Sequence, residues 1–420
     1  MDKFWPEDLS IVFIPFEGLK PLRNAVAERT LRVALFTDSF HETNGVATLS
    51  RAYVEYARRQ NIPFFCAYGG DRESFAVAGS TQKLCLRRGW LSFPFDAEMK
   101  CDLALVRHRA VVLRRLRAFQ PDLIHITGPG DVSVLGFWVS NTLTVPLVAS
   151  WHTNLHEYAE RRLRGIPGNG AALAKAWSFR ALMKYYRLAH FVTSPNEEMR
   201  QMLESETARP SFVMAHGVDT KCFSPRWRRP GDGRFCVGYV GRLTPEKNVR
   251  ALVEIERELE QEGNQDFRIL VVGAGSEEEW LRTNLRRAEF SGTLHGDALA
   301  AAFAEMDTMV FPSHTDTFGL VVLEAMASGV PVILTEAAGR RVGVVDGESG
   351  ILTTNFAEGV RRVMQTPGLR ERMGETAREH ARERGWGRVF ENLQAIYRSG
   401  LASGEVRARI RRAEERLAVG

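Results

Sequence analysis

The chain has 420 residues, 44% hydrophobic and 25% charged, so it is long enough for two ordinary domains and is neither disordered nor fibrous. It has no apolar run of bilayer length, no signal segment at its beginning and no C-x-x-C pair among five cysteines, which predicts a reduced, cytoplasmic protein without a disulfide framework or zinc site. The net charge of +5 is too small and scattered for a nucleic-acid-binding protein.

The first half of the chain alternates short apolar runs with helical patterns. Residues 1–28 match no pattern and are treated as an N-terminal extension. Expected strands cover residues 31–36, 62–67, 122–127, 145–150 and 191–194. Expected helices cover about residues 48–59 and 103–119. Strands separated by helices require crossover connections, which predicts a parallel sheet in an N-terminal, acceptor-side Rossmann-like domain over residues 29–215.

The same rhythm restarts after a turn-rich connection at residues 219–233, which contains two prolines and two glycines and is a natural hinge. Expected strands cover residues 234–240, 267–272, a short run from 290, 308–311 and 330–334. A helix is expected at about residues 248–261, and the chain is helical and charged from about residue 369. We therefore expect a C-terminal donor-binding domain over residues 216–395 and a helical tail over residues 396–420. Ligands of parallel α/β sheets bind outside the carboxyl ends of strands, so two facing domains define one cleft.

The richest segment is residues 311–332, which has the pattern strand, loop, helix, glycine stop and strand. Asp316 precedes the predicted helix, and Glu324 lies eight positions later, two turns into it. Unpaired N–H groups at a helix start favour an anion or polar hydroxyl groups. In this segment they would be the backbone amides of Phe318, Gly319 and Leu320.

A carboxylate on each side of this helix start suits a ligand rich in hydroxyl groups. The structural alternative makes Asp316 a helix-terminal charge and Glu324 a surface residue. Glu324, however, lies between Leu323 and Ala325 in an otherwise apolar helix, where a lone carboxylate is costly without a partner. The pattern therefore favours a functional pair.

A second group of polar residues follows the first strand of the second domain. Arg242 and Lys247 lie five positions apart across a turn at Pro245, so they can converge on one diphosphate. Exposed basic residues in a loop are usually only solvated. Their place at the carboxyl end of a strand strengthens the functional interpretation.

Together these segments resemble the retaining GT-B glycosyltransferases of family 4 (glycosyltransferase group 1), nearest to lipid-glycosylating and mannosyltransferase-like members. The motif-bearing segments are residues 121–125, 216–225, 241–248, 316–329 and 346–352. The resemblance runs from about Leu31 to about Tyr397 and implies an α/β fold with two Rossmann-like domains facing a cleft. The family usually has Glu where this chain has Asp316, which shortens the reach of that carboxylate.

The resemblance also implies roles for the donor-side residues. Arg242 and Lys247 would hold the diphosphate, and Glu324 would hold the ribose hydroxyl groups. Asp316 and the amides of Phe318, Gly319 and Leu320 would hold the transferred sugar.

The remaining candidates are two histidines and two glycines, namely His152, His295, Gly45 and Gly273. His152 matches the family's active-site histidine and forms the predicted catalytic pair with Asp316; its alternative is a buried core histidine. Gly45 would let the backbone approach donor and acceptor, and its alternative is a turn glycine. Gly273 and His295 are expected near the nucleobase.

The expected reaction follows from these residues and the resemblance. Arg242, Lys247 and the helix start can neutralise the charge of a nucleoside diphosphate leaving group. The chain contains no Asp-x-Asp, so a metal clamp has no obvious ligands, and we expect neither a metal nor another cofactor. The resemblance implies retention, with the acceptor attacking the face that the phosphate leaves and a phosphate oxygen taking its proton.

The expected partners are a nucleotide-sugar donor, either a UDP-sugar or GDP-mannose, and a membrane lipid acceptor. Residues 1–215 contain 27 Lys and Arg against 21 Asp and Glu, and residues 161–164 are Arg-Arg-Leu-Arg. Such a basic domain fits a peripheral contact with anionic lipid head groups, although solvated arginines are the alternative. A soluble sugar or polysaccharide is the rival acceptor, and the oligomeric state is not predicted.

Three other functions remain as alternatives. A nucleotide-sugar epimerase can share this architecture, but its motifs are not found. An NAD-dependent dehydrogenase is disfavoured because Gly273-Ala-Gly275 is only a partial dinucleotide fingerprint. A non-catalytic sugar-nucleotide sensor is disfavoured by the intact donor residues.

Overall fold

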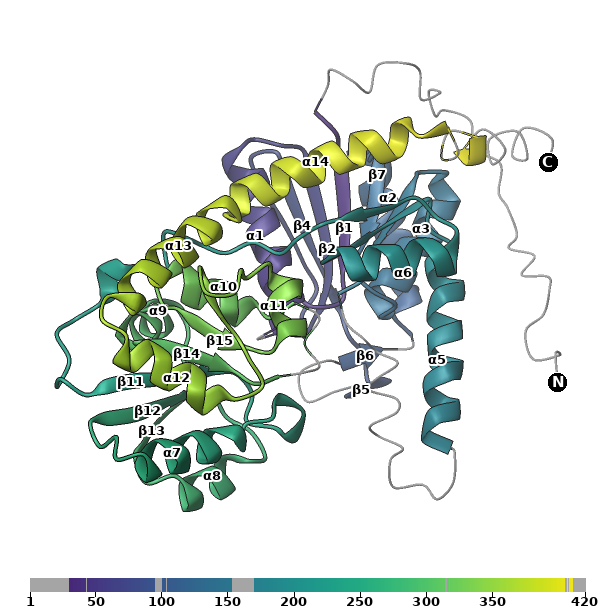
Figure 1. Ribbon diagram of the computed structural model, residues 1–420. Coiled ribbons are helices and arrows are strands. Elements are labelled where there is room, and N and C mark those ends of the chain that lie inside the picture. The colour runs from purple at the N-terminus through teal and green to yellow at the C-terminus, as the bar shows by residue number, and fades with distance from the viewer. Residues whose placement is uncertain are drawn as a thin grey trace.

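The computed structural model describes residues 30–42, 44–94, 100–102, 104–152, 170–313, 316, 318–404, 406 and 408–410. Over these ranges the chain forms two α/β domains, each with helices on both faces of a central sheet (Figure 1). The expected extension at residues 1–28, the basic run at residues 161–164 and the end of the tail at residues 411–420 lie outside the described ranges.

The N-terminal sheet, in its described part, has the strand order β10-β9-β8-β7-β1-β2-β4-β3. All neighbouring strands are parallel except β3 and β4. The strands are β1 (Val33–Thr37), β2 (Phe64–Gly70), β3 (Ser74–Ala78), β4 (Thr81–Arg87), β7 (Leu123–Ile126), β8 (Leu147–Ser150), β9 (Phe191–Ser194) and β10 (Ser211–Val213). A separate antiparallel hairpin pairs β5 (Ser92–Pro94) with β6 (Lys100–Asp102). The sequence patterns predict β1, β2, β7, β8 and β9, but not β3 to β6 or β10.

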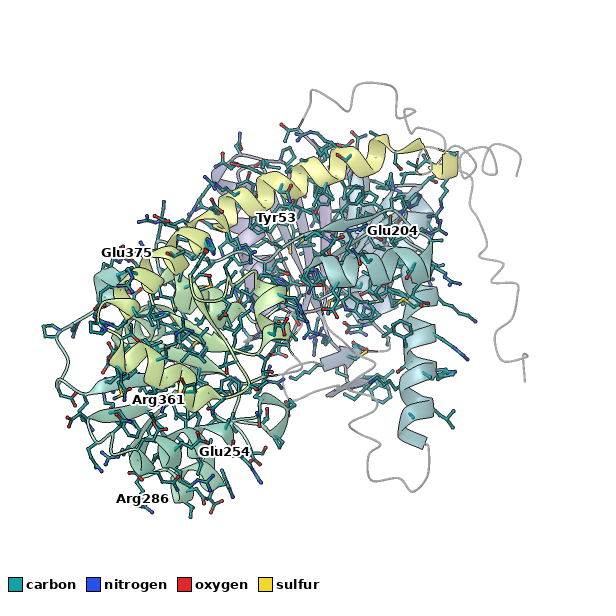
Figure 2. The ribbon with its side chains drawn as sticks, in the orientation of Figure 1. Tyr53, Glu204, Glu254, Arg286, Arg361 and Glu375 are labelled. Carbon is teal, nitrogen blue, oxygen red and sulfur yellow. The ribbon has the colours of Figure 1, made fainter. Side chains whose placement is uncertain are left out.

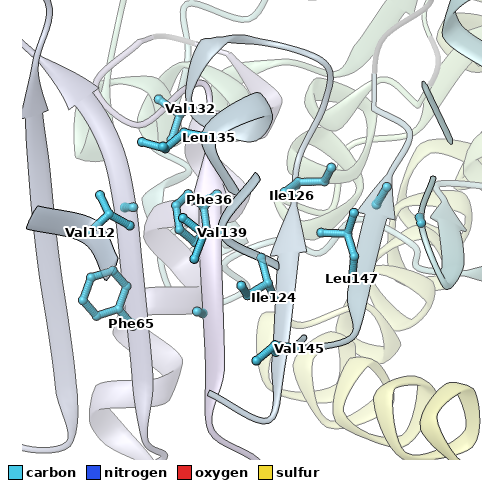
Figure 3. Packing of buried hydrophobic residues seen from close by; sticks show 14 of the residues in the cluster. Phe36, Phe65, Val112, Ile124, Ile126, Val132, Leu135, Val139, Val145 and Leu147 are labelled. Carbon is cyan, nitrogen blue, oxygen red and sulfur yellow. The ribbon is translucent and has the colours of Figure 1, made fainter. Parts of the chain in front are cut away.

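The helices of this domain form because apolar residues recur at helical spacing. They are α1 (Gly45–Arg59), the 3₁₀ turn η1 (Leu105–His108), α2 (Arg109–Phe119), α3 (Asp131–Leu143), α5 (Gly170–Tyr186) and α6 (Glu197–Thr207). On one face of the sheet, Phe36 of β1 and Ile124 of β7 pack against Val139 of α3 (Figure 3). Alternate residues of β1, such as Leu35, face a second core on the opposite side. Both faces of the sheet are therefore buried.

The C-terminal sheet has the strand order β13-β12-β11-β14-β15-β16 among the described residues, and all neighbours are parallel. The strands are β11 (Phe235–Val240), β12 (Phe267–Val272), β13 (Ala288–Gly292), β14 (Thr308–Phe311), β15 (Val332–Leu334) and β16 (Gly350–Leu352). The helices are η2 (Pro225–Trp227), η3 (Pro245–Lys247), α7 (Ala251–Gln261), α8 (Glu278–Asn284), α9 (Gly296–Glu305), α10 (Leu320–Ala327), α11 (Glu336–Val342), α12 (Phe356–Gln365) and α13 (Leu369–Glu383). The strand order reverses between β11 and β14, which is the topological switch point of a Rossmann fold.

The chain crosses between the domains at two neighbouring places. Val218 donates its N–H to the carbonyl of Arg384 at 3.0 Å, and Val218 forms a β-bridge with Gly385. The outward and return crossings therefore lie side by side. Hinges between domains are formed by a few such residues in the connecting segments.

The last long helix, α14 (Trp386–Ala402), returns to the N-terminal domain and lies over α1 (Figure 1). Phe390 of α14 stacks on Tyr53 of α1, whose hydroxyl accepts a hydrogen bond from Gln394 at 2.8 Å (Tyr53 is labelled in Figure 2). Tyr397 contacts the buried His125 of β7 at 2.6 Å. The division expected at residue 395 falls inside this helix, which packs on the N-terminal domain over its whole described length.

Candidate active site

The candidate site lies at the switch point of the C-terminal sheet, where the loops after β11 and β14 meet. Lys247, at the end of η3, forms an ion pair with Asp316, which follows β14. Both side chains are largely buried. The sheet thus brings together two predicted residues that lie far apart in the sequence.

The loop after β11 is held by contacts between backbones. Gly273 follows β12 with φ of +137°, and a Cβ atom there would lie 1.9 Å from the carbonyl oxygen of Gly241. Only glycine permits this approach and this dihedral angle. The Arg242 carbonyl also accepts a hydrogen bond from Tyr239 at 2.9 Å. Gly273 therefore supports the loop that carries Arg242 and Lys247.

Arg242 is the more exposed of the two predicted phosphate-binding residues. Its guanidinium lies 3.7 Å from Glu246, four positions along the same loop. Lys247 is enclosed and paired across the site, whereas Arg242 remains near its rim. The two cations therefore differ in exposure and in the carboxylate with which each is paired.

Helix α10 begins at the predicted helix start. Gly319 is its N-cap residue with φ of +77°, and no side-chain cap hydrogen bond is found at this end among the residues that the structure describes. Phe318 is buried beside it, and Leu320 is the first helical residue. Because the first helical residue is Leu320, Glu324 lies little more than one turn into the helix and not two turns as predicted. The uncapped amide groups carry partial positive charge and favour an anion or hydroxyl oxygen.

Glu324 is a carboxyl group in largely apolar surroundings, which disfavour its charged form. Its side chain is half-buried, and its neighbours Leu323 and Ala325 are fully buried. Burial raises the pKa of the Glu324 carboxyl to about 7. The carboxyl is thus poised between its neutral and ionised forms near neutral pH, and hydroxyl donors would stabilise the ionised form.

The N-terminal domain meets this site through the start of α1. Asn44 caps α1 by accepting a hydrogen bond from the Ala47 amide at 2.9 Å, so Gly45 is the first residue of a helix rather than a turn glycine. A Cβ atom on Gly45 would lie 3.0 Å from Cδ1 of Leu320. The beginnings of α1 and α10 therefore face each other across the two domains.

His152 reaches the same region from the end of β8. It is buried, and its ring centre lies 5.3 Å from that of His216, which lies 4.8 Å from Phe318. Burial, reinforced by the neighbouring histidines, lowers the pKa of His152 well below its usual value. Burial also lowers the pKa of His216 to about 4. Both imidazoles are therefore neutral at pH 7.

Comparisons with known proteins agree with this geometry. Residues 43–221 match the family model described as Glycosyltransferase Family 4, and residues 225–380 match that of Glycosyl transferases group 1. A GDP-mannose-dependent alpha-mannosyltransferase of Mycolicibacterium smegmatis is 33% identical over 70% of this chain and 77% of its own length. This chain belongs to the group 1, family 4 glycosyltransferases.

Two further comparisons place this glycosyltransferase within its family. The sulfoquinovosyl transferase SQD2 of Arabidopsis thaliana is 28% identical over 84% of this chain and 71% of its own length. The solved structure of Anabaena HepE in complex with UDP and glucose shares the fold, with a TM-score of 0.62 and 18% identity over 88% of this chain and all of that one. The predicted GT-B fold is confirmed.

One predicted site residue, His295, lies apart from the others in the sheet. His295 is exposed and occupies the N-cap position of α9, without a side-chain cap hydrogen bond. It follows β13, which is separated from β11 by β12 in the sheet. Its part in a nucleobase pocket stays a prediction. Gly273 is nearer, through its contact with Gly241.

Two residues near the site are not among those predicted. His216 belongs to a motif recognised in the sequence, but only the fold reveals its position between His152 and Phe318. Arg341 of α11 donates to the carbonyl of Asp316 at 3.0 Å and lies 3.5 Å from Glu198 of the N-terminal domain. No sequence signal indicates that Arg341 links the two domains.

The described part of the glycosyltransferase contains no group of three or more His, Cys, Asp and Glu side chains that could hold a metal ion. Within the same ranges, no helix combines the length and apolar character that a bilayer-spanning segment requires.

Proposed function

We propose that this enzyme transfers a hexose from GDP-mannose or a UDP-sugar to a hydroxyl group of a membrane lipid, with retention at the anomeric carbon and without a metal ion. The observation that carries the proposal is the convergence of Lys247, Asp316 and the uncapped start of α10, opposite Gly45 of the other domain. The relative named as GDP-mannose-dependent supports GDP-mannose as the first donor to test.

The donor diphosphate would bind between Arg242, Lys247 and the amide groups at the start of α10. Lys247 is paired with Asp316, and a bound diphosphate would take over this cation and free Asp316 for a sugar hydroxyl. The ribose hydroxyl groups would donate to Glu324, which stabilises its carboxylate form. Each predicted group then has a distinct part of the donor to bind.

The chemical step would need little acid–base catalysis by side chains. The acceptor oxygen attacks the anomeric carbon on the face from which the phosphate leaves, and the acceptor proton passes to a departing phosphate oxygen. The products are the glycoside and a nucleoside diphosphate, whose charge Arg242, Lys247 and the helix start stabilise. His152 is neutral and would position a sugar hydroxyl group.

The test offers labelled GDP-mannose and UDP-glucose separately, with detergent-dispersed membrane lipids or with soluble sugars, in the presence of EDTA. The proposal predicts label in the lipid fraction from one donor, unaffected by EDTA, with the anomeric configuration of the donor by NMR. Label only in soluble sugars would overturn the lipid acceptor, and loss of activity with EDTA would overturn the metal-free site. An inverted product would contradict retention.

A further inference from the structure

The exposed large aromatic and leucine side chains of the described residues fall into two segments of the N-terminal domain. One segment is residues 90–93 at the beginning of the β5–β6 hairpin, where Trp90 is 91% exposed and Leu91 and Phe93 are also exposed. The other segment is α5 together with Leu188, which follows shortly after the helix. In it, Leu173 is 68% and Trp177 69% exposed, and Leu188 is also exposed. Exposed apolar clusters of this kind mark interaction surfaces.

The topology places both segments at the carboxyl edge of the N-terminal sheet. Residues 90–93 follow the carboxyl end of β4, which runs parallel to β2 and β1. Helix α5 has 17 residues and is about 25 Å long, whereas the four-residue strand β9 that it precedes spans only about 13 Å. The beginning of α5, which carries Leu173, therefore extends past this edge, and Trp177, in the middle of the helix, lies about level with it. Figure 1 shows the beginning of α5 below the sheet together with the hairpin.

The exposed face of α5 combines apolar and basic side chains. Leu173, Trp177, Arg180 and Lys184 recur at spacings of four, three and four residues and are exposed, whereas Met183 and Tyr186 on the opposite face are buried. Helix α5 contains Lys175, Arg180 and Lys184 and no acidic residue. Tryptophan beside Lys and Arg, without acidic side chains, is the chemistry that recognises an anionic lipid interface.

We propose that residues 90–93 and the exposed face of α5 form a membrane-docking surface that inserts Trp90 and Trp177 into the head-group region of an anionic bilayer. The surface lies at the same edge of the sheet as Gly45 and His152, so docking brings lipid head groups to the acceptor side of the site. This inference rests on the proposed function, since it identifies how a lipid acceptor reaches the enzyme.

The experiment is co-sedimentation of the full chain with phosphatidylcholine vesicles, with and without phosphatidylglycerol, at low salt. We expect the wild type to sediment with anionic vesicles. Substituting both Trp90→Ser and Trp177→Ser should weaken this partition about tenfold or more, since two large apolar groups are lost. The pair Arg180→Gln and Lys184→Gln should weaken it about fivefold per residue at low salt.

The matched control is Arg257→Gln, which removes an exposed charge from α7 of the C-terminal domain and should leave sedimentation unchanged. Nucleotide-induced thermal shifts measured on each variant establish that the donor domain is intact. The proposal is overturned if the wild type does not sediment, or if the double-tryptophan variant sediments like the wild type. It is also overturned if the wild type self-associates through these residues in the absence of vesicles.

Failure of the docking surface and failure of the proposed function give different results. Sugar transfer to detergent-dispersed lipid without vesicle binding would overturn the docking surface alone. Vesicle binding that is lost in the tryptophan variant, together with transfer only to soluble sugars, would overturn the lipid acceptor and leave the docking surface standing.

Discussion

The sheet of each domain has a topological switch point, but different side chains occupy the two switch points. In the C-terminal domain, the loop after the first strand carries Arg242 and Lys247, and the described residues show no side-chain cap on the helix that follows β14. In the N-terminal domain, the loop after β1 carries Asp38, whose carboxylate accepts hydrogen bonds from the Gly130 amide at 3.1 Å and the Ser133 amide at 2.9 Å. In the C-terminal domain, a basic loop thus lies beside a helix start for which the described residues show no side-chain cap, whereas in the N-terminal domain Asp38 occupies the helix start.

Asp38 closes the helix start that would otherwise attract a ligand. Ser133 also donates its hydroxyl to Asp38 at 2.6 Å, and a Cβ atom on Gly130 would lie 2.4 Å from the Asp38 carboxyl carbon. Burial raises the pKa of Asp38 to about 6 despite these hydrogen bonds. The comparison shows that a carboxylate of the protein itself can occupy the helix start at a Rossmann switch point, which is where an anionic ligand would otherwise bind.

The largest expected effect comes from removing Lys247, the largely buried cation at the switch point of the C-terminal domain. Lys247→Ala should lower kcat/KM for sugar transfer by about 100- to 1000-fold, because the leaving diphosphate loses a preorganised positive charge. Steady-state kinetics with the identified donor measure this change. Arg257→Ala on α7 serves as the matched control, and an unaffected rate in Lys247→Ala would contradict the assignment.

The next effect is the pH dependence of nucleotide binding through Glu324. The free carboxyl has a raised pKa of about 7, and ribose hydroxyl groups bind its ionised form, so affinity should fall about tenfold per pH unit below pH 7. Glu324→Gln should bind more weakly at pH 8 and lack this dependence. Calorimetric titration between pH 6 and 8 compares the two proteins.

Ionisation of the nucleotide phosphate occurs in the same pH range and is common to both proteins, so the difference between the two profiles isolates Glu324. Parallel profiles for wild type and Glu324→Gln would remove Glu324 from the ribose site.

A moderate effect on stability is expected from removing Asp38 at the switch point of the N-terminal domain. Asp38→Ala leaves the Gly130 and Ser133 donors without their acceptor and should destabilise the N-terminal domain by about 1–3 kcal/mol. Thermal unfolding measures the loss. Asp71→Ala, at a side chain 94% exposed in the same domain, should change stability by less than about 0.5 kcal/mol. Equal stability of the two variants would show that Asp38 is not a cap.

The smallest expected effect concerns the link between the domains. Arg341→Gln removes the contacts with Glu198 and the Asp316 carbonyl and should raise KM for the donor by at most about fivefold, because part-exposed ion pairs contribute little. The neighbouring Arg340 pairs only within α11 among the contacts described, with Glu336 at 2.7 Å, so Arg340→Gln is the matched control. Identical KM values for both variants would exclude a role for Arg341 in positioning Asp316.

Much of the fold could be predicted because its parallel strands are short apolar runs between helical patterns. Strands β3 to β6 escape prediction because they lack a continuous buried pattern; β3, for instance, has exposed residues along most of its length. Lys247 and Asp316 could each be selected from motifs that follow strands, whereas the ion pair between them could not be predicted from the sequence. The position of His216, the cap formed by Asp38 and the bridge formed by Arg341 depend on contacts between segments distant in sequence, which no local pattern encodes.

The most direct test of the difference between the switch points is calorimetric titration of GDP and UDP, without metal, into wild type, Glu324→Ala and Asp38→Ala. The account predicts one nucleotide per chain, bound by wild type and Asp38→Ala with similar affinity and lost or strongly weakened in Glu324→Ala. Binding that survives in Glu324→Ala but disappears in Asp38→Ala would contradict it, because the nucleotide would then occupy the N-terminal domain.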